Sequence, residues 1–531
     1  MTRPLPQLAS FCLALLTAYA GLATAGPRPG SQGAPVADLA ALRAFGEDEA
    51  AEPVVPSPVP PVAAPTWPAR IAARLAEVSS RAQARAAARE AQGPGPASLR
   101  RTLAKLVGRA GAGVGIHVAD LDDGTWLFDQ NGGARLNPAS NHKIVTAVAA
   151  VELLGPDYRF VTRLVRDGDA LVLVGDGDPS LQIQGLHALA SRAVAAGAHV
   201  GARRIVVDGS AFTPERHGPG YEEPPGPGPS YLAPSGALSL SFNTVEVTAA
   251  RDGATVSVEV APASGHVEIV NQARVGRGRA VEAVSACEGD ATRITVTGAV
   301  GVRPVTLRRR ICDPGRFTGE AFAALLEQVG GPRLPVEAGV ASGHAREVAS
   351  LASPPLVEIL ASALKYSNNF TSEQVLRTLG RRMTGGPGSW ESGRAALAAF
   401  WRAAGNAPEE LVAENGSGLS LRGRVSPRGL VRVLALTRDE GAPAAALLPA
   451  LAAAGGEGTL RMRLAGGRGR VRGKTGTIGG VSALSGLAAT PDGRRALGFS
   501  VLINGRKLPL ARSRRLQDKV VAALLGHLDQ G

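Results

Sequence analysis

The sequence predicts a mixed α/β protein of two or three domains. Its 531 residues exceed what one hydrophobic core usually organises. Segments with helical periodicity and strand-forming runs occupy 98–160 and 350–531. Between them, residues 161–349 consist mainly of short β-rich runs separated by Gly, Pro and Asp turns. We therefore expect a β-rich unit set between two α/β segments.

The N-terminus has the pattern of an export signal. Arg3 precedes the apolar run "LASFCLALLTAYAGLA", and Ala23-Thr24-Ala25 offers a small-x-small cleavage site. The run is shorter than the ~20 apolar residues that span a bilayer, which favours a cleaved signal peptide at 1–25 over an uncleaved anchor. The mature protein is therefore expected to be exported to the periplasm.

Residues 26–97 are expected to form a linker. "GPRPGSQGAPVADLA" and "AAEPVVPSPVPPVAAPTWP" are rich in Pro and Ala, a composition that disfavours a packed core. The next segment, "ARIAARLAEVSSRAQARAAAREAQ", contains strong helix formers but few large apolar residues. It is expected to be either a solvated helix or a continuation of the linker.

The first α/β segment predicts a hairpin followed by a helix. "GVGIHVADLDDGTWLFDQN" contains two apolar runs around a turn at Asp122-Asp123-Gly124. Asn137 then supplies an N-cap and Pro138 the first helical position. The apolar run continues to Leu154, and Gly155 is expected to end the helix.

The last α/β segment predicts helices and then strands. Helical pattern occurs in "PPLVEILASALKYSNNFTSEQVLRTLG" and "GRAALAAFWRAAG". Three strands are expected in "RVRGKTGTI", "VSALSGLAAT" and "RALGFSVLING", with a turn at Pro491-Asp492-Gly493 between the last two. A final helix is expected at about 508–528.

Charge and cysteines limit the function classes. The formal net charge is +13, but aromatic residues are not interleaved with the basic runs, so no nucleic-acid partner is expected. Attraction to anionic envelope surfaces is favoured about equally with a role of Arg in solubility. Beyond the signal peptide, Cys287 and Cys312 form either one disulfide, which we favour, or two buried thiols. Two cysteines without clustered His indicate no metal site.

A Ser-x-x-K motif supplies the candidate nucleophile. On a helix, residues three apart are offset by about 60° and residues two apart by about 200°. Lys143 therefore lies on the face of Ser140, whereas His142 points away and is expected to be a packing or surface residue. Ser140 also lies near the helix start, where its N–H has no intrahelical acceptor and can donate to an oxyanion.

Two further motifs strengthen this hypothesis. Ser367-x-Asn369 occurs in "KYSNNFTSEQ", and Lys474-Thr475-Gly476 occurs in "VRGKTGTIGG". Each motif alone is weak. Ser-x-x-K, Ser-x-Asn and Lys-Thr-Gly in this order are the set that serine penicillin-recognising enzymes use.

On these motifs the chain resembles the low-molecular-mass penicillin-binding proteins of peptidase family S13, which are D-alanyl-D-alanine carboxypeptidases/endopeptidases. "GDGDPSL", "YLAPSGALSLSFNTVEV", "ENGSGLSLRGRVSP" and "EGTLRMRL" extend the resemblance, which covers about 98–528. It implies a serine β-lactamase/DD-peptidase-like α/β fold, with an antiparallel sheet flanked by helices. This domain would be split into 98–160 and 350–531 by a large β-rich inserted domain at 161–349, with a further subdomain inside the insertion left open.

The resemblance also implies a mechanism. Ser140 would attack the carbonyl between two D-alanines of a peptidoglycan stem peptide, with Lys143 as general base. Ser367 would relay a proton to the leaving amine, and Lys474 would tune that hydroxyl. Asn369 would hold the substrate amide and help to position Lys143.

The remaining motif residues would bind substrate. Thr475, Gly476 and Thr477 would hold the terminal carboxylate or the peptide backbone, and the N–H groups of Ser140 and Thr477 would form the oxyanion hole. Water would then hydrolyse the acyl-enzyme, and a β-lactam would acylate Ser140 in the same way. The mechanism implies no cofactor.

Two alternatives remain open. A β-lactamase shares two of the motifs, but the class A fold has no room for the long separation between Ser140 and Ser367. A catalytically weak peptidoglycan-binding scaffold is disfavoured because all three motifs are intact. The sequence does not choose between carboxypeptidase and endopeptidase action.

Overall fold

The structure is a computed structural model that describes residues 66–90, 97–108, 113–221, 229–277, 280–505 and 509–530. All of them belong to one compact unit, Pro65–Gly531. The expected signal peptide at 1–25 and most of the expected linker lie outside the described residues. Among the helices that are described, none is long and apolar enough to cross a membrane.

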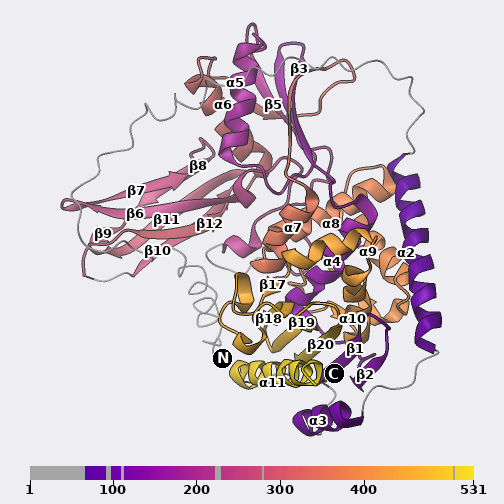
Figure 1. Ribbon diagram of the computed structural model, residues 1–531. Coiled ribbons are helices and arrows are strands. Elements are labelled where there is room, and N and C mark those ends of the chain that lie inside the picture. Colours follow the sequence, from indigo (N-terminus) through magenta and orange to yellow (C-terminus); the bar gives the residue numbers. More distant parts are fainter. Residues whose placement is uncertain are drawn as a thin grey trace, which may run out of the picture. The chain divides into compact units, whose positions relative to one another are not determined.

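A six-stranded antiparallel sheet joins the two α/β segments (Figure 1). Its order is β17-β18-β19-β20-β1-β2, and β1 pairs with β20 from Val114 opposite Ile503 to Asp120 opposite Leu497. The predicted hairpin and the three predicted C-terminal strands are confirmed. The strands are β1 Val114–Asp120, β2 Trp126–Gln130, β17 Ala452–Ala453, β18 Val471–Ile478, β19 Val481–Ala489 and β20 Ala496–Asn504.

Helices cover both faces of this sheet, as the predicted fold class requires. Neighbouring residues of a strand point to opposite faces, so Val501 of β20 packs with one helical layer and Leu502 with the other. The first layer consists of α3 Ala97–Val107 and α11 Leu510–Leu528. The second layer contains α4 His142–Leu154, α7 Leu356–Lys365, α8 Asn369–Thr384, α9 Trp390–Ala403 and α10 Pro427–Ala435. A short pair, β15 Leu411–Val412 and β16 Arg424–Val425, lies outside the sheet.

Helix α2, Trp67–Glu90, corrects the expectation of a solvated helix or further linker. Ile71 and Val78 are buried in the same core as α4, and Leu75 packs against that core. Arg81 also forms an ion pair with the buried carboxylate of Glu152 on α4. Residues 71, 75 and 78 make a narrow apolar stripe at helical spacing, which is enough to dock a helix of otherwise small and charged residues.

The β-rich unit is inserted through two adjacent strands. β3 Val161–Asp167 enters it and β14 Arg346–Ala352 leaves it, and the two pair antiparallel with Val161 opposite Ala352. Entry and exit therefore lie side by side, so a long insertion leaves the surrounding fold intact. These two strands belong to a five-stranded sheet of order β13-β5-β4-β3-β14, completed by β4 Ala170–Val174, β5 Arg204–Asp208 and β13 Val336–Ala338.

The described remainder of the insertion adds smaller sheets and two α-helices. Its other strands are β6 Thr244–Asp252, β7 Thr255–Ala261, β8 Val267–Asn271, β9 Arg274–Val275, β10 Val281–Glu288, β11 Ala291–Val300 and β12 Val305–Arg310. The helices α5 Ile183–Ala195 and α6 Pro314–Gln328 were not predicted, although Leu186, Leu189 and Ala190 form a buried helical stripe. Cys287 and Cys312 are joined in a disulfide with an S–S distance of 2.00 Å.

Candidate active site

Ser140 lies in a tight turn immediately before α4. The turn is a 3₁₀ helix, Ala139–Asn141, and α4 begins at His142 rather than at Pro138 as predicted. Ala139 has a φ of +45°, and the side chain of Asn137 accepts a hydrogen bond from the Ala139 N–H at 2.8 Å. A positive φ interrupts a continuous α-helix, which is why the helix starts later. Its end at Gly155 is as predicted.

Lys143 contacts Ser140 and is fully buried. Its Nζ lies 3.1 Å from the Ser140 Oγ, 2.8 Å from the Asn369 Oδ1 and 2.8 Å from the carbonyl oxygen of Ser417. Burial, reinforced by the like charge of Lys474, holds the pKa of Lys143 well below its usual range. A lysine of this kind becomes neutral at a lower pH than an ordinary lysine, and in its neutral form it can accept the serine proton.

His142 is a buried packing residue. Its side chain is 2% exposed, and its Nε2 has no hydrogen-bond partner within the described part of the chain. Burial and the neighbouring Lys143 lower the pKa of His142 to about 4, so the imidazole is neutral at pH 7. Of the two basic residues in the motif, Lys143 is the one whose side chain contacts Ser140.

The Ser-x-Asn motif links α7 to α8. Ser367 lies between the helices with a φ of +65°, and Asn369 begins α8. Asn368 is the N-cap of α8, and its side chain accepts a hydrogen bond from the Thr371 N–H at 3.1 Å. The middle residue of the motif, Asn368, therefore caps the helix whose first residue, Asn369, contacts Lys143. Asn369 also donates to the carbonyl oxygen of Tyr231, in the insertion, at 3.2 Å.

Strand β18 brings the Lys-Thr-Gly motif against the turn of Ser140. A Cβ atom on Gly476 would lie 2.8 Å from the carbonyl oxygen of Pro138 and 3.0 Å from the Ser140 nitrogen, so the two backbones meet there. Lys474 is fully buried, and burial lowers the pKa of its ammonium to about 7. Thr475 and Thr477 lie on the same strand and are half-buried.

Glu373 on α8 is a buried site residue that the sequence patterns did not reveal. It accepts hydrogen bonds from the backbone N–H groups of Gly416 at 3.1 Å and Ser417 at 2.9 Å. The indole of Trp390 donates to it at 2.8 Å, and the hydroxyl of Tyr221 donates to it at 3.3 Å. Glu373 thus orients the loop whose Ser417 carbonyl accepts a hydrogen bond from Lys143.

Two other polar residues of α8 attach the insertion to the site. Arg377, which is fully buried, donates to the carbonyl oxygen of Glu215 and to the Ser235 hydroxyl, both at 3.0 Å. Gln374 donates to the carbonyl oxygen of Gly236 at 2.8 Å. The helix that begins at Asn369 therefore carries both a motif residue and the contacts that hold the insertion. Large buried polar side chains on a helix are the signal that points to such a junction.

Glu373→Gln should slow acylation of Ser140 and shift the acidic limb of the pH–rate profile, which is the range in which the acylation rate rises with pH. Glutamine would place an NH₂ group against two donors, which costs on the order of 1–3 kcal/mol and disturbs the Ser417 carbonyl. The charge of Glu373 raises the pKa of Lys143, so its loss should shift the acidic limb to lower pH. Glu152→Gln, at another buried carboxylate, should lower stability and leave the limb unmoved. If the acidic limb of the Glu373→Gln variant stayed at the wild-type pH, the assignment of Glu373 as a residue that acts on Lys143 would be contradicted.

The acylation rate should increase with pH and level off well below pH 10.5, the ordinary value for lysine. Only the neutral amine of Lys143 accepts a proton, so the rate follows its deprotonation. Stopped-flow acylation by a chromogenic penicillin measures the profile. Lys474→Ala removes the like charge, so its residual rate should have an acidic limb at higher pH. The exposed Lys519→Ala should leave the limb in place.

Comparisons with known proteins agree over most of the described chain. A family model described as D-Ala-D-Ala carboxypeptidase 3 (S13) family matches residues 97–525. A D-alanyl-D-alanine carboxypeptidase from Actinomadura sp. is 33% identical over 450 residues, covering 78% of this chain and 81% of that protein. Carboxypeptidase DacB from Mycolicibacterium smegmatis is 26% identical over 436 residues, covering 77% of this chain and 81% of that protein. The crystal structure of penicillin binding protein 4 (dacB) from Haemophilus influenzae superposes with a TM-score of 0.66 at 21% identity, covering 80% of this chain and 99% of that one. Helix α2 precedes the residues that the family model matches.

Proposed function

Because the chain belongs to the D-Ala-D-Ala carboxypeptidase 3 (S13) family, we propose that it hydrolyses the terminal D-Ala-D-Ala bond of peptidoglycan stem peptides through an acyl-enzyme on Ser140. One observation carries the residue assignment. The Nζ of Lys143 lies within hydrogen-bond distance of both the Ser140 Oγ and the Asn369 Oδ1. A nucleophile, a base and an orienting amide from two distant motifs therefore meet at one point.

In the acylation step, neutral Lys143 takes the proton of the Ser140 hydroxyl as the oxygen attacks the D-alanyl carbonyl carbon. The backbone N–H groups of Ser140 and Thr477 stabilise the oxyanion of the tetrahedral intermediate. The peptide C–N bond then breaks, and Ser367 relays the proton to the leaving nitrogen of the last D-alanine. The Lys474 charge supports this relay and attracts the substrate carboxylate.

Binding and deacylation complete the cycle. Thr475, Gly476 and Thr477 hold the terminal carboxylate or the peptide backbone, and Asn369 holds the substrate amide. Water attacks the ester carbonyl, gives a proton to Lys143, and releases the shortened peptide while the hydroxyl of Ser140 is restored. A β-lactam acylates Ser140 in the same way, but its leaving nitrogen stays tethered to the acyl group, so the acyl-enzyme persists.

The cellular setting is part of the proposal. The signal-peptide pattern at 1–25 supports export to the periplasm, where stem peptides are accessible. The net charge of +13 supports peripheral contact with anionic envelope surfaces. An endopeptidase activity on D-alanyl crosslinks uses the same chemistry and differs only in the group that leaves. The polar contacts among Ser140, Lys143 and Asn369 disfavour an inactive scaffold.

Digestion of defined muropeptides, analysed by mass spectrometry, tests the function. A pentapeptide monomer should lose one D-alanine, and Ser140→Ala should leave it intact. A crosslinked dimer in the same assay reports endopeptidase action. Release of D-alanine by Ser140→Ala at the wild-type rate would refute the proposal.

A further inference from the structure

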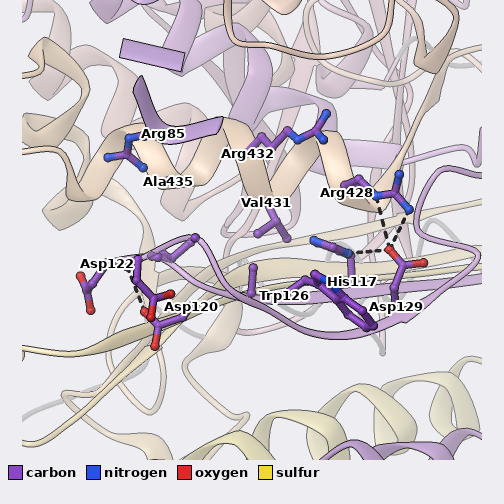
Figure 2. A pocket seen from close by; sticks show the side chains of 14 residues that line it. Arg85, His117, Asp120, Asp122, Trp126, Asp129, Arg428, Val431, Arg432 and Ala435 are labelled. Carbon is purple, nitrogen blue, oxygen red and sulfur yellow. Dashed lines mark hydrogen bonds and ion pairs between the residues drawn. The ribbon is translucent and has the colours of Figure 1, made fainter. Parts of the chain in front are cut away.

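A cavity lies away from the candidate active site. It has a volume of about 410 Å³ and opens between the β1–β2 hairpin, α10 and α2 (Figure 2). In Figure 2 Arg85, Arg428 and Arg432 line its helical side, whereas Asp120 and Trp126 come from the hairpin. None of the motif residues lines it. Its volume is within the range of small-molecule sites.

The cavity combines an exposed aromatic ring with small apolar side chains. Trp126 is 41% exposed, which is unusual for the largest apolar side chain. Ala119, Val431 and Ala435 supply an apolar wall. A flat indole at the mouth of a partly apolar cavity offers a surface on which a ring with an apolar face can stack.

The charged residues of the cavity are largely compensated already. Their ion pairs are Asp120–Arg495 at 2.9 Å, Asp122–Arg438 at 3.1 Å, Asp129–Arg428 at 3.0 Å and Arg85–Asp439 at 3.4 Å. Arg432 donates to the carbonyl oxygen of Gly405 at 3.0 Å. A strongly charged ligand would have to compete with these pairs. The cavity therefore favours a ligand that is nearly neutral and rich in hydrogen-bonding groups.

His117 adds a fixed hydrogen-bond acceptor. Its Nδ1 lies 2.8 Å from the Asp129 Oδ2. Burial lowers the pKa of His117. Burial would raise the pKa of Asp129, but the hydrogen bonds that this carboxylate accepts from His117 and Arg428 hold its pKa below the usual value. A neutral imidazole beside an ionised carboxylate carries its proton on Nδ1, which leaves Nε2 as an acceptor.

We propose that this cavity binds a sugar unit of the peptidoglycan glycan strand, with one ring face on Trp126 and hydroxyl groups on the polar side chains around it. A pyranose has an apolar C–H face, which can stack on the indole, and an edge of hydroxyls, which can form hydrogen bonds with charged side chains that are already paired. It therefore matches this cavity. This inference rests on the proposed function, since the stem peptide is attached to the glycan.

The placement of the cavity suits such an exosite. In the sheet, β19, β20 and β1 separate β18, which carries the Lys-Thr-Gly motif, from β2, which carries Trp126. Four strand spacings amount to about 19 Å. A stem peptide of five residues spans at most ~17 Å when extended, so the peptide that reaches Ser140 would belong to a neighbouring unit of the glycan strand. Holding the glycan would therefore increase the effective concentration of its attached peptides at Ser140. Arg85 lies on α2, which precedes the residues that the family model matches.

Binding and turnover measurements on the full chain test the proposal. Saturation-transfer NMR with the peptide-free disaccharide N-acetylglucosaminyl-N-acetylmuramic acid should show saturable binding to Ser140→Ala protein. Trp126→Ala in that background should weaken binding by about tenfold or more, the loss expected when a stacking ring is removed. Trp126→Phe should restore part of it. Val302→Ala, at an 88% exposed site in the insertion, is the surface control.

Turnover separates this inference from the proposed function. In an otherwise wild-type chain, Trp126→Ala should lower kcat/KM for pentapeptides carried on a glycan strand of several disaccharides and leave kcat/KM for the free pentapeptide unchanged. No saturable disaccharide binding, or equal binding by wild type and Trp126→Ala, would overturn the exosite while leaving free-pentapeptide hydrolysis intact. Loss of activity on both substrates would show that Trp126 supports the fold rather than a sugar site.

Discussion

Lys143→Ala should lower the rate of Ser140 acylation by about 10²–10⁴-fold, the range that general acid–base catalysis supplies. The Nζ of Lys143 is 3.1 Å from the Ser140 Oγ, and no other described basic side chain is hydrogen-bonded to that oxygen. Without this base, the hydroxyl must lose its proton to solvent. Stopped-flow measurement of acylation by a chromogenic penicillin gives the rate constant directly.

His142→Ala is the matched control. His142 is as deeply buried as Lys143, so its replacement should lower stability, yet most of the acylation rate should remain when it is measured well below the melting temperature. The reverse ranking, with His142→Ala inactive and Lys143→Ala active, would show that the wrong residue was identified as the base.

Gly476→Ala should lower acylation by about 10²-fold, because a misplacement of the reacting groups by ~1 Å has an effect of that size. The added Cβ would lie 2.8 Å from the Pro138 carbonyl oxygen and 3.0 Å from the Ser140 nitrogen. Both are backbone atoms, so the conflict is relieved only by moving the turn of Ser140 or strand β18.

Gly479→Ala provides the control for this substitution. Gly479 lies between β18 and β19, and a Cβ there would meet no atom within 4 Å. The Gly479→Ala variant should therefore be acylated at the wild-type rate. Equal rates for Gly476→Ala and wild type would mean that β18 does not hold the nucleophile in place.

Local patterns predicted much of the site. Helical spacing alone put Lys143 on the face of Ser140, and it did so although Ser140 lies in a 3₁₀ turn, because both helix types bring residues three apart together. The hairpin and the C-terminal strands followed from alternation and turn residues. The three motifs predicted which distant segments meet, and the contact between Lys143 and Asn369 agrees with that.

Long-range packing accounts for what the sequence did not reveal. Glu373 is held by partners in three different segments, and no local pattern encodes such a network. The stripe of Ile71 and Val78 becomes meaningful only against the surface of α4, so α2 was expected to be solvated or unfolded linker. The positive φ of Ala139, which delays the start of α4, also depends on tertiary contacts rather than on residue type.

Intact-mass spectrometry after incubation with benzylpenicillin tests the central claim most directly. The wild-type chain should gain the mass of one penicillin, and peptide mapping should place the adduct on Ser140. Ser140→Ala should gain none. An unmodified wild-type chain, or an adduct that persists in Ser140→Ala, would contradict the assignment of Ser140 as the nucleophile.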